Sequence, residues 1–289
     1  MLKNILITGA NSYIGTSLEK WLNQYPDKYK INTVDMINNN WREKSFEGYD
    51  VVFHVAGLAH VSTDPKMKEI YYKVNRDLTI ETALKAKNDG VKQFIFMSSI
   101  IVYGDSSFIN KERVINIDTI PIPSNFYGDS KLQAEKGILQ LQDYNFNIVI
   151  IRPPMIYGKG SKGNYKLLSK IAKKSPIFPN ISNKRSMLHI DNLCEFIRIM
   201  IKNEECGIFF PQNDEYVNTS ELVKLIAKYS GKRIRETKIF NPLLKIMGNY
   251  ITSINKAFGS LVYDKEMSKY KENYIVNDID ESIYKTERL

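Results

Sequence analysis

The chain starts with a short apolar strand that leads straight into a glycine-rich turn and a helix, and this feature restricts the fold more than any other. Residues 3–8 centre on three consecutive aliphatic side chains, and residues 9–15 read Gly-Ala-Asn-Ser-Tyr-Ile-Gly. Apolar residues then recur at helical spacing. A strand, a tight turn and a helix in this order point backbone N–H groups at a phosphate. The pattern therefore predicts a cradle for a dinucleotide.

The first half of the sequence continues to alternate apolar runs with amphipathic stretches. Further strands are predicted at Ile31–Asp35, Asp50–Ala56, Gln93–Ser98 and Asn147–Arg152, and long helices at Met67–Asp89 and Tyr127–Tyr144. Solid apolar runs are typical of parallel strands that are buried on both faces. The alternation predicts an α/β fold with a Rossmann-type, doubly wound parallel sheet.

The composition of the sequence changes after Arg152, where prolines and glycines become frequent. A chain of 289 residues allows one large or two small domains. We expect residues 1–160 to form an NAD(P)-binding Rossmann domain, with a returning segment near 189–212. We expect residues 161–188 and 213–289 to form a smaller, C-terminal substrate-binding lobe.

The predicted cradle has two glycines with different tasks. Gly9 allows the tight turn and Gly15 allows the helix to approach the sheet. Ser12 stands where a middle glycine is usual, and its hydroxyl can bond a phosphate. The candidate cofactor-binding residues of this turn are Gly9, Asn11, Ser12, Tyr13, Ile14 and Gly15.

Other strand ends supply further cofactor candidates. Asp35 lies twenty residues after Gly15, and a carboxylate there accepts hydrogen bonds from a ribose 2′-hydroxyl and repels a 2′-phosphate. The carboxylate therefore favours NAD. Arg42 could bind a 2′-phosphate, however, so NADP is also possible. Around the third predicted strand, Asp50 and Val51 could flank the adenine, and Ala56 and Gly57 let the backbone approach the cofactor.

Tyr127 and Lys131 are four residues apart and share one helix face. A tyrosine has a pKa near 10, which must fall by about three units, or roughly 4 kcal/mol, for the side chain to act as a base near neutral pH. A cation about 5 Å away supplies roughly 3 kcal/mol at an effective dielectric constant of about 20. We therefore expect Lys131 to lower the pKa of Tyr127, and an oxidised nicotinamide to lower it further.

Ser99 follows the fourth predicted strand, at the edge where open α/β sheets bind ligands. Its hydroxyl can orient a reacting oxygen. The spacing of Tyr127 and Lys131 also arises by chance in a chain with 18 tyrosines, so an ordinary surface helix is the alternative. The order of the three residues on a predicted nucleotide-binding sheet favours a site that moves a hydride and a proton.

The composition excludes several classes of function. The net charge is +9, but the lysines are dispersed and no basic block is interleaved with aromatics, so we expect no nucleic-acid partner. The two cysteines, Cys194 and Cys206, lack metal-ligand spacing, and we expect no metal. No run of eighteen apolar residues predicts a membrane span. An immediate strand leaves no room for a signal peptide, so we expect a cytoplasmic protein.

The sequence resembles the extended short-chain dehydrogenases/reductases of the NAD-dependent epimerase/dehydratase family over nearly its whole length. The resemblance rests on the following motifs: Thr8-Gly9 with Gly15, Asp50-Val51, Ala56-Gly57, Ser98-Ser99-x3-Tyr103-Gly104, Tyr127-x3-Lys131, Arg152-Pro153-Pro154-x2-Tyr157-Gly158 and Arg185-Ser186-x2-His189-x-Asp191.

The resemblance implies roles for individual residues. Ser99, Tyr127 and Lys131 would be catalytic, with Lys131 also holding the nicotinamide ribose. Pro153 and Pro154 would lie near the nicotinamide, Asn75 would lie near the site, and Asn164 and Arg185 would meet the diphosphate of a UDP-sugar. His189 and Asp191 would be structural, with Asp191 capping the next helix. The family often dimerises through the two helices predicted at Met67–Asp89 and Tyr127–Tyr144, so a homodimer is possible.

Within the family, the motifs most resemble bacterial capsule and O-antigen enzymes that reduce a UDP-4-keto-6-deoxy-N-acetylhexosamine at C4. The resemblance therefore favours a C4 reductase. A UDP-glucose or UDP-N-acetylglucosamine 4-epimerase with tightly bound NAD is the alternative, although Ala59 stands where epimerases carry a phosphate-binding lysine. The neighbouring His60 is interpreted as a loop histidine. A dehydratase is disfavoured because Ile100-Ile101 replaces an acidic pair.

Two further alternatives stay open. A non-catalytic dinucleotide sensor could use the same fold, although it would not need Tyr127 and Lys131. The apolar stretch Asn241–Leu261 could form a flap over the core or a contact with a membrane surface, and the first is favoured.

Overall fold

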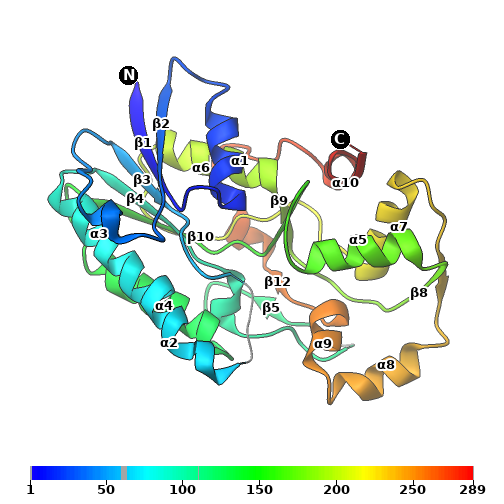
Figure 1. Ribbon diagram of the computed structural model, residues 1–289. Coiled ribbons are helices and arrows are strands. Elements are labelled where there is room, and N and C mark those ends of the chain that lie inside the picture. The colour runs from blue at the N-terminus through cyan, green and yellow to red at the C-terminus, as the bar shows by residue number, and fades with distance from the viewer. Residues whose placement is uncertain (1, 60–63, 110, 289) are drawn as a thin grey trace. The chain divides into compact units, whose positions relative to one another are not determined.

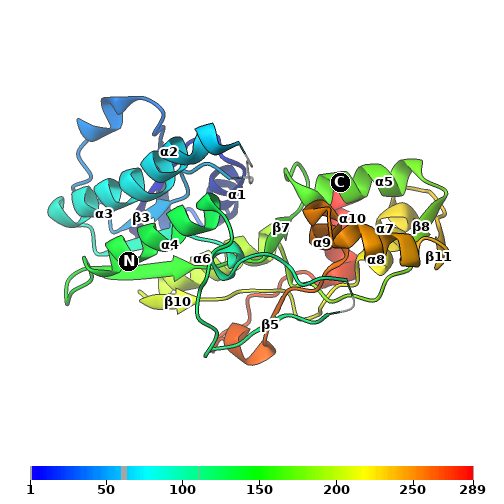
Figure 2. The same ribbon diagram turned by 90° about the horizontal axis from the view of Figure 1, so that it is seen from below.

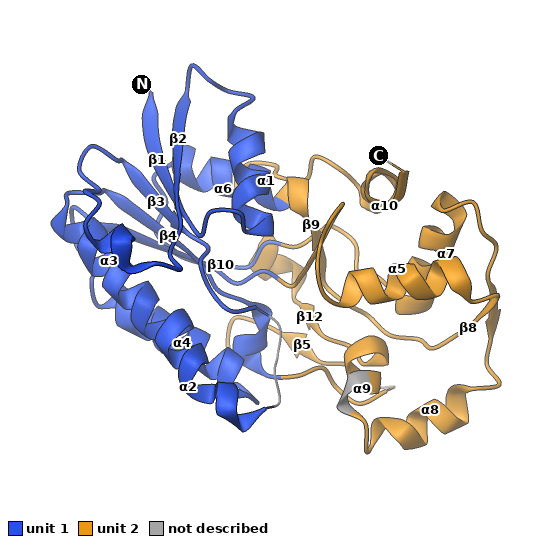
Figure 3. Ribbon diagram, in the orientation of Figure 1, with its two compact units in different colours: residues 1–104, 121–153, 193–211 blue, residues 105–120, 154–192, 212–289 orange. Residues whose placement is uncertain are grey.

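The computed structural model describes residues 2–59, 64–109 and 111–288. The chain divides into two compact units, each assembled from separate stretches of sequence (Figure 3). The first unit comprises Met1–Gly104, Pro121–Pro153 and Leu193–Pro211. The second comprises Asp105–Ile120, Pro154–Asn192 and Gln212–Leu289. The first unit therefore gives way to the second at Pro154, whereas we expected the change at residue 160. The second unit also includes residues 105–120, which we expected in the first.

The first unit is built on a parallel sheet. In the described part of the chain this sheet has six strands, in the order β10-β6-β4-β3-β1-β2. The strands are β1 (Lys3–Thr8), β2 (Tyr29–Val34), β3 (Val51–His54), β4 (Gln93–Met97), β6 (Asn147–Ile151) and β10 (Gly207–Phe209). Every pair of neighbours is parallel. The strand order reverses between β1 and β3, which makes a switch point of the kind where such sheets bind ligands. The Rossmann-type prediction is confirmed.

Helices cover both faces of this sheet (Figure 1). They include α1 (Tyr13–Leu22), α3 (Leu78–Asn88), α4 (Phe126–Leu139) and α6 (Ile190–Lys202). Alternate strand residues such as Leu6, Val52 and Phe94 share one core cluster with alanines of α3 and α4. The intervening Ile5, Ile7 and Ile95 are fully buried too. Because both sets of side chains are covered, the strands read as continuous apolar runs.

The helix predicted at Met67–Asp89 has an irregular middle. After a short 3₁₀ turn (η2, Pro65–Met67), α2 (Lys68–Tyr71) passes into a π-helical stretch, η3 (Tyr72–Asp77), which continues into α3. π-Helical turns are rare and occur frequently at functional sites. The buried Asn75 lies within this stretch, so the irregularity sets the position of a predicted site residue.

The second unit has a small core between short strand pairs and helices (Figure 2). The pairs are β5 (Val114–Ile115) with β12 (Val262–Tyr263), β7 (Met155–Tyr157) with β9 (Met187–His189), and β8 (Ile177–Pro179) with β11 (Arg235–Thr237). The helices are α5 (Asn164–Lys174), α7 (Thr219–Tyr229), α8 (Asn241–Gly248), α9 (Thr252–Phe258) and α10 (Ile279–Arg288). Short 3₁₀ turns complete the chain at η1 (Asn39–Arg42), η4 (Ile100–Tyr103) and η5 (Lys265–Ser268).

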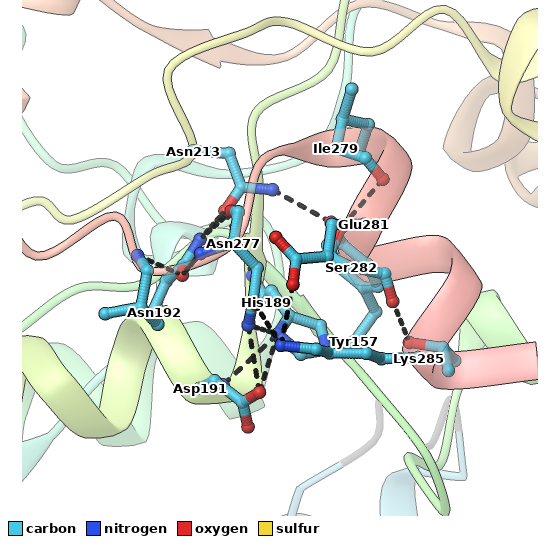
Figure 4. Close-up of polar contacts among 12 residues, drawn as sticks. Tyr157, His189, Asp191, Asn192, Asn213, Asn277, Ile279, Glu281, Ser282 and Lys285 are labelled. Carbon is cyan, nitrogen blue, oxygen red and sulfur yellow. Dashed lines mark hydrogen bonds and ion pairs between the residues drawn. The ribbon is translucent and has the colours of Figure 1, made fainter. Parts of the chain in front are cut away.

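A buried polar network stabilises the second unit (Figure 4). The Tyr157 hydroxyl lies 2.6 Å from Ser282 Oγ and accepts from Asn213 Nδ2 at 2.9 Å. The His189 ring packs edge-on against the Tyr157 ring. Asp191 Oδ2 accepts a hydrogen bond from Asn277 Nδ2 at 2.9 Å. Asp191 lies in the first turn of α6 and does not precede the helix as a cap. The expectation that Asp191 caps this helix was wrong. Its carboxylate instead accepts a hydrogen bond from Asn277, in the segment before α10.

No helix among residues 2–59, 64–109 and 111–288 is long and apolar enough to cross a membrane.

Candidate functional site

The glycine-rich turn after β1 is shaped by close backbone packing. Gly9 has a φ of +89°, and a Cβ there would lie 2.9 Å from the Cα and N atoms of Ala56. A Cβ on Gly15 would lie 3.3 Å from Ile7 Cγ2 and 3.2 Å from Val55 Cγ1. Asn11 also has a positive φ, of 65°. Side chains at Gly9 and Gly15 would collide with these neighbours, so the turn packs this closely only with glycine, and it leads into the start of a helix, where backbone N–H groups can bind a phosphate.

Ser12 has a different contact from the one expected. Its Oγ accepts a hydrogen bond from Gly15 N at 3.1 Å and so caps α1. Tyr13 and Ile14 form the first turn of that helix. The cap satisfies one amide at the helix start and holds the turn in the shape that the cradle requires.

Asp35 stands beside this turn. It directly follows β2, and both Gly9 N and Ala10 N donate to Val34 O, at 2.9 and 3.1 Å. The Asp35 side chain is exposed and accepts from Ile37 N at 2.9 Å. Arg42, the alternative partner of a 2′-phosphate, is engaged with Glu81, whose Oε2 lies 2.6 Å from the guanidinium. The arrangement favours a ribose hydroxyl over a 2′-phosphate.

Asp50 and Val51 lie at the wrong edge of the sheet for a cofactor contact. Val51 is the first residue of β3, and Asp50 accepts from Asn4 N at 2.9 Å at the beginning of β1. In a parallel sheet the amino and carboxyl ends of the strands lie at opposite edges, and the cradle follows the carboxyl end. This placement argues against the predicted adenine contact, and we leave both residues out of the proposed site.

The loop after β3 is fixed by Asn75. Its Oδ1 accepts from Leu58 N at 2.8 Å, and its Nδ2 donates to Leu58 O and Ser130 Oγ at 3.2 Å each. A Cβ added to Gly57 would lie 3.0 Å from Asn75 Oδ1 and 3.3 Å from Lys131 Nζ. Gly57 thus permits a close approach between this loop and the predicted proton site. His60 lies outside the described residues.

Tyr127 and Ser99 meet at the carboxyl edge of the sheet. Tyr127 is in the first turn of α4, which starts where Asn125 Oδ1 accepts from Gly128 N at 3.0 Å. Ser99 follows β4 and caps η4, with its Oγ accepting from Ile101 N at 3.3 Å. Ser99 is close enough to the Tyr127 phenol to lower its pKa. The Tyr127 ring packs edge-on against Tyr71, with centroids 5.9 Å apart.

Lys131 is buried one helical turn further along α4. Its Nζ donates to Met97 O at 2.8 Å and lies 4.6 Å from the centroid of the Phe96 ring. Burial lowers the pKa of Lys131 to about 8, and the charge of Glu135 acts in the opposite direction. The side chain is therefore mostly protonated at neutral pH.

The expected lowering of the Tyr127 pKa is not found in the free protein. Burial raises the pKa of Tyr127 to about 12, and the Ser99 side chain offsets this only in part. Lys131 is not among the groups that shift it. The prediction was wrong for the free protein because helix spacing gives the proximity of a cation but not the loss of solvent around the phenol.

A charged network beside Lys131 escaped the sequence analysis. Arg152 NH2 lies 2.5 Å from Glu135 Oε2, and Arg152 NH1 donates to the Tyr103 hydroxyl at 2.7 Å. Ser98 Oγ donates to Glu135 Oε1. All four side chains are buried. The signal was present in part, because Glu135 is four residues from Lys131 on the same helix face.

His54 is a second group that the sequence analysis missed. It is fully buried at the end of β3, 2.7 Å from Thr8 Oγ1 through Nδ1 and 3.1 Å from Thr79 Oγ1 through Nε2. Burial, aided by the Lys131 charge, lowers the pKa of His54 to about 3. This neutral imidazole links β1 to α3 behind the predicted site.

The predicted residues fall into two groups. Pro153 follows β6, and its carbonyl accepts from Ile100 N at 2.9 Å, so it shares the carboxyl edge with Ser99. Pro154, Asn164 and Arg185 belong to the second unit. Asn164 is exposed at the start of α5. Arg185 is partly buried, donates to Gly259 O at 3.0 Å and keeps its charge, although burial lowers its pKa to about 10.

Comparison with known proteins identifies the family. Residues 5–209 match the model of the NAD dependent epimerase/dehydratase family. The chain belongs to this family. The expected family and the expectation of an NAD(P)-dependent enzyme are confirmed, and so is the nicotinamide cofactor.

Members of the epimerase/dehydratase family with similar sequences include two with 4-epimerase names. The chain is 32% identical to a UDP-glucose 4-epimerase of Vibrio cholerae over 78% of this chain and 76% of that protein. It is 28% identical to an N-acetyl-alpha-D-glucosaminyl-diphospho-ditrans,octacis-undecaprenol 4-epimerase of Escherichia coli O157:H7, over 90% of this chain and 82% of the relative.

A solved member has a similar fold. The UDP-glucuronic acid 4-epimerase of Bacillus cereus, solved in complex with NAD, superposes with a TM-score of 0.73. The match has 18% identity and covers 98% of this chain and 96% of that one.

Proposed function

We propose that this protein transfers a hydride and a proton at C4 of a UDP-linked sugar. The observation that carries the proposal is the meeting of Ser99, Tyr127 and Lys131 at the carboxyl edge of the sheet, next to the Gly9–Gly15 cradle. Reaction at C4 needs one hydroxyl group that exchanges a proton with the sugar oxygen, and one that orients it. Tyr127 takes the first role and Ser99 the second.

The nicotinamide cofactor supplies or accepts the hydride when it is bound. The Gly9–Gly15 turn holds its diphosphate and Asp35 its adenosine ribose. Lys131 holds the nicotinamide ribose and keeps a positive charge beside Tyr127. Asn75 and Gly57 shape the loop that approaches the ring, and Pro153 borders it.

Within this chemistry, we propose reduction of the C4 keto group of a UDP-4-keto-6-deoxy-N-acetylhexosamine. In this direction Tyr127 acts as a neutral phenol that donates its proton to the reduced oxygen. Ala59 supports this direction, since epimerases resembling this chain carry a lysine at that position.

A 4-epimerase is the second candidate, and the names of the two sequence relatives favour it. The residues would be the same, but Tyr127 would first have to lose its proton. Because burial opposes the phenolate in the free protein, the positive charge of an oxidised nicotinamide would have to supply the compensation.

Assays of the purified protein separate the two candidates. UDP-4-keto-6-deoxy-N-acetylglucosamine is offered with NADH or NADPH, and UDP-glucose or UDP-N-acetylglucosamine is offered without added cofactor. Cofactor oxidation with the keto sugar supports the reductase, with NADH preferred because of Asp35. Interconversion of C4 epimers without added cofactor rejects it in favour of the epimerase. Tyr127→Phe lowers either rate by about 10²–10⁴-fold, whereas Tyr144→Phe, at an exposed position, leaves it unchanged.

We also propose that the second unit binds the substrate diphosphate through Asn164 and Arg185. Arg185→Gln then raises KM for the nucleotide sugar about tenfold or more, in line with the loss of a charge-assisted hydrogen bond. The dissociation constant of the cofactor stays unchanged. Arg235→Gln, at an exposed arginine of the same unit, serves as the matched control. Equal KM values for the two variants would reject this role for Arg185.

A further inference from the structure

The outer face of α8 carries an unusual set of exposed apolar side chains. Leu243 is 57% exposed, Ile246 60%, Ile239 82% and Tyr250 84%. Leu243 and Ile246 lie on α8 itself, whereas Ile239 precedes the helix and Tyr250 lies in the turn after it. Phe240 and Ile251 are exposed beside them. We call these six residues, Ile239, Phe240, Leu243, Ile246, Tyr250 and Ile251, the α8 patch.

The opposite side of α8 already faces the core of the second unit. Leu244 packs against that core, together with Ile254 of α9. Gly248 is buried, and a Cβ there would lie 3.5 Å from Ile109 Cδ1 and 2.8 Å from Asn255 Oδ1. The favoured expectation of a core flap therefore fits the inner face and α9, where Phe258 is buried. It gives no reason for the apolar character of the outer face.

The segment that carries the α8 patch is basic, although one of its lysines, Lys256, pairs with Asp105 at 3.5 Å. From Thr237 to Tyr263 the sequence contains three lysines and no Asp or Glu. Lys238 and Lys245 are exposed; Lys245 lies on α8 and Lys238 lies just before it. Nearby, Phe108 is 51% exposed and has Lys111 Nζ 5.9 Å from its ring centroid. Phe108 and Tyr250 line the same hollow on the second unit.

We propose that the α8 patch docks the protein on the surface of an anionic lipid bilayer. Exposed apolar side chains on and beside a short helix, with exposed lysines next to them, are features of a segment that lies in the plane of a membrane interface. The leucine and isoleucines would enter the acyl boundary, Tyr250 would sit at headgroup level, and Lys238 and Lys245 would contact anionic headgroups. This docking is peripheral and independent of the proposed reaction.

A second copy of the chain fits this surface less well. A symmetric contact through the α8 patch would bring the same lysines of two copies together. The segment offers no carboxylate to pair with them. The charge pattern therefore complements a negatively charged lipid surface better than it complements itself.

Vesicle co-sedimentation of the full chain tests the proposal. The protein should bind vesicles of phosphatidylcholine with phosphatidylglycerol more tightly than vesicles of phosphatidylcholine alone. Leu243→Ser/Ile246→Ser should weaken binding about tenfold or more. Lys238→Gln/Lys245→Gln should weaken it about 25-fold, at about fivefold per lysine. Added salt should weaken the wild type more than the lysine variant.

Matched variants serve as controls. Tyr250→Ser should weaken vesicle binding, whereas Tyr144→Ser, at a tyrosine that is 98% exposed on the first unit, should not. Lys30→Gln/Lys136→Gln removes two exposed lysines elsewhere and should have much less effect than the α8 pair. An unchanged unfolding temperature verifies that each variant is folded.

Three outcomes would overturn the proposal. The first is no binding to either kind of vesicle. The second is binding that the α8 variants do not weaken. The third is a loss of self-association in the α8 variants, seen by light scattering, with vesicle binding unchanged, which would make the patch a contact between copies of the chain.

Discussion

At the carboxyl edge of the sheet, burial affects the pKa values of Tyr127 and Lys131 more than their spacing along α4 does. Burial raises the pKa of Tyr127 above the ordinary value of a tyrosine, so its phenol is neutral at neutral pH in the free protein. Lys131 keeps its charge because a backbone carbonyl and a nearby carboxylate stabilise it. In the proposed reaction, the charge of an oxidised cofactor would favour loss of the Tyr127 proton.

The ionisation of Tyr127 can be measured directly. Without cofactor, the tyrosinate absorption of the wild type minus that of Tyr127→Phe should appear only as the pH approaches about 12, because burial raises the pKa of this phenol. Saturation with NAD⁺ should move the step to lower pH, since the nicotinium charge stabilises the phenolate. A step near neutral pH in the free protein would contradict the assigned environment.

The buried pair of Glu135 and Arg152 is a second residue-scale test. Glu135→Gln leaves the Arg152 guanidinium buried without its carboxylate and should destabilise the first unit by about 3–5 kcal/mol. The double variant Glu135→Gln/Arg152→Met removes both charges, and its free energy of unfolding should decrease clearly less than that of Glu135→Gln. Denaturant unfolding of the single and double variants measures the difference. Additive losses would show that the two side chains are not coupled.

Among the elements, the turn between β1 and α1 is the most constrained. Gly9 combines a positive φ with contact against the backbone of Ala56. Gly90 has a similar φ of +80°, but a Cβ there would meet nothing within 4 Å. The two glycines thus separate the cost of backbone strain from the cost of close packing.

Alanine at these glycines tests that separation. Gly90→Ala should destabilise the protein by about 1 kcal/mol from backbone strain alone. Gly9→Ala should cost about 1–3 kcal/mol more, because its Cβ overlaps backbone atoms that cannot move freely. Only Gly9→Ala should weaken NAD binding, as measured by calorimetry. Equal stabilities and affinities would reject close packing as the reason for Gly9.

Much at this scale could be predicted from the sequence. The apolar runs predicted strands of the sheet, and Gly9 and Ser99 directly follow or come close after the ends of β1 and β4, where parallel strands align their carboxyl ends. The π-helical stretch around Asn75 could not be predicted, since one wider turn does not change the apolar period of a long helix.

The residues that sequence reasoning missed depend on distant partners. Glu135 and Arg152 are 17 residues apart and meet only when α4 packs on the sheet. Asp50 and Val51 were expected at the start of the third strand and lie there, but that edge of the sheet is opposite the Gly9–Gly15 turn, which argues against the predicted adenine contact. The pKa of Tyr127 depends on solvent exclusion, which no spacing in the sequence reports.

On the scale of the whole molecule, the described residues of each unit include one buried, neutral histidine. Burial lowers the pKa of His54, in the first unit, to about 3, and that of His189, in the second, to about 4. In an unfolded chain a histidine titrates near 6.5. Between these values the unfolded state binds more protons, so the stability that each neutral histidine gives is complete above pH 6.5 and falls as the pH drops.

Acid titration of stability tests this account. The free energy of unfolding should decrease from about pH 6.5 towards pH 4, with a slope of up to about 1.4 kcal/mol per pH unit for each histidine. His54→Asn should remove one such contribution from the first unit, and His189→Asn one from the second. Comparison well above pH 6.5 gives the cost of each substitution itself. An unchanged slope in both variants would disprove the linkage.

The homodimer through α3 and α4 stays a prediction. The family membership supports a nicotinamide enzyme. How many copies act together is a question for light scattering on the purified protein.

The interleaving of the two units has a consequence for biosynthesis. The edge strand β10 belongs to the sheet but is translated after residues 154–192, which belong to the other unit. A ribosome must therefore have made most of the polypeptide before the first sheet is complete. Until β10 is made, the edge of β6 that pairs with it stays unpaired in the nascent chain. A truncated chain that ends before β10 would have the same unpaired edge.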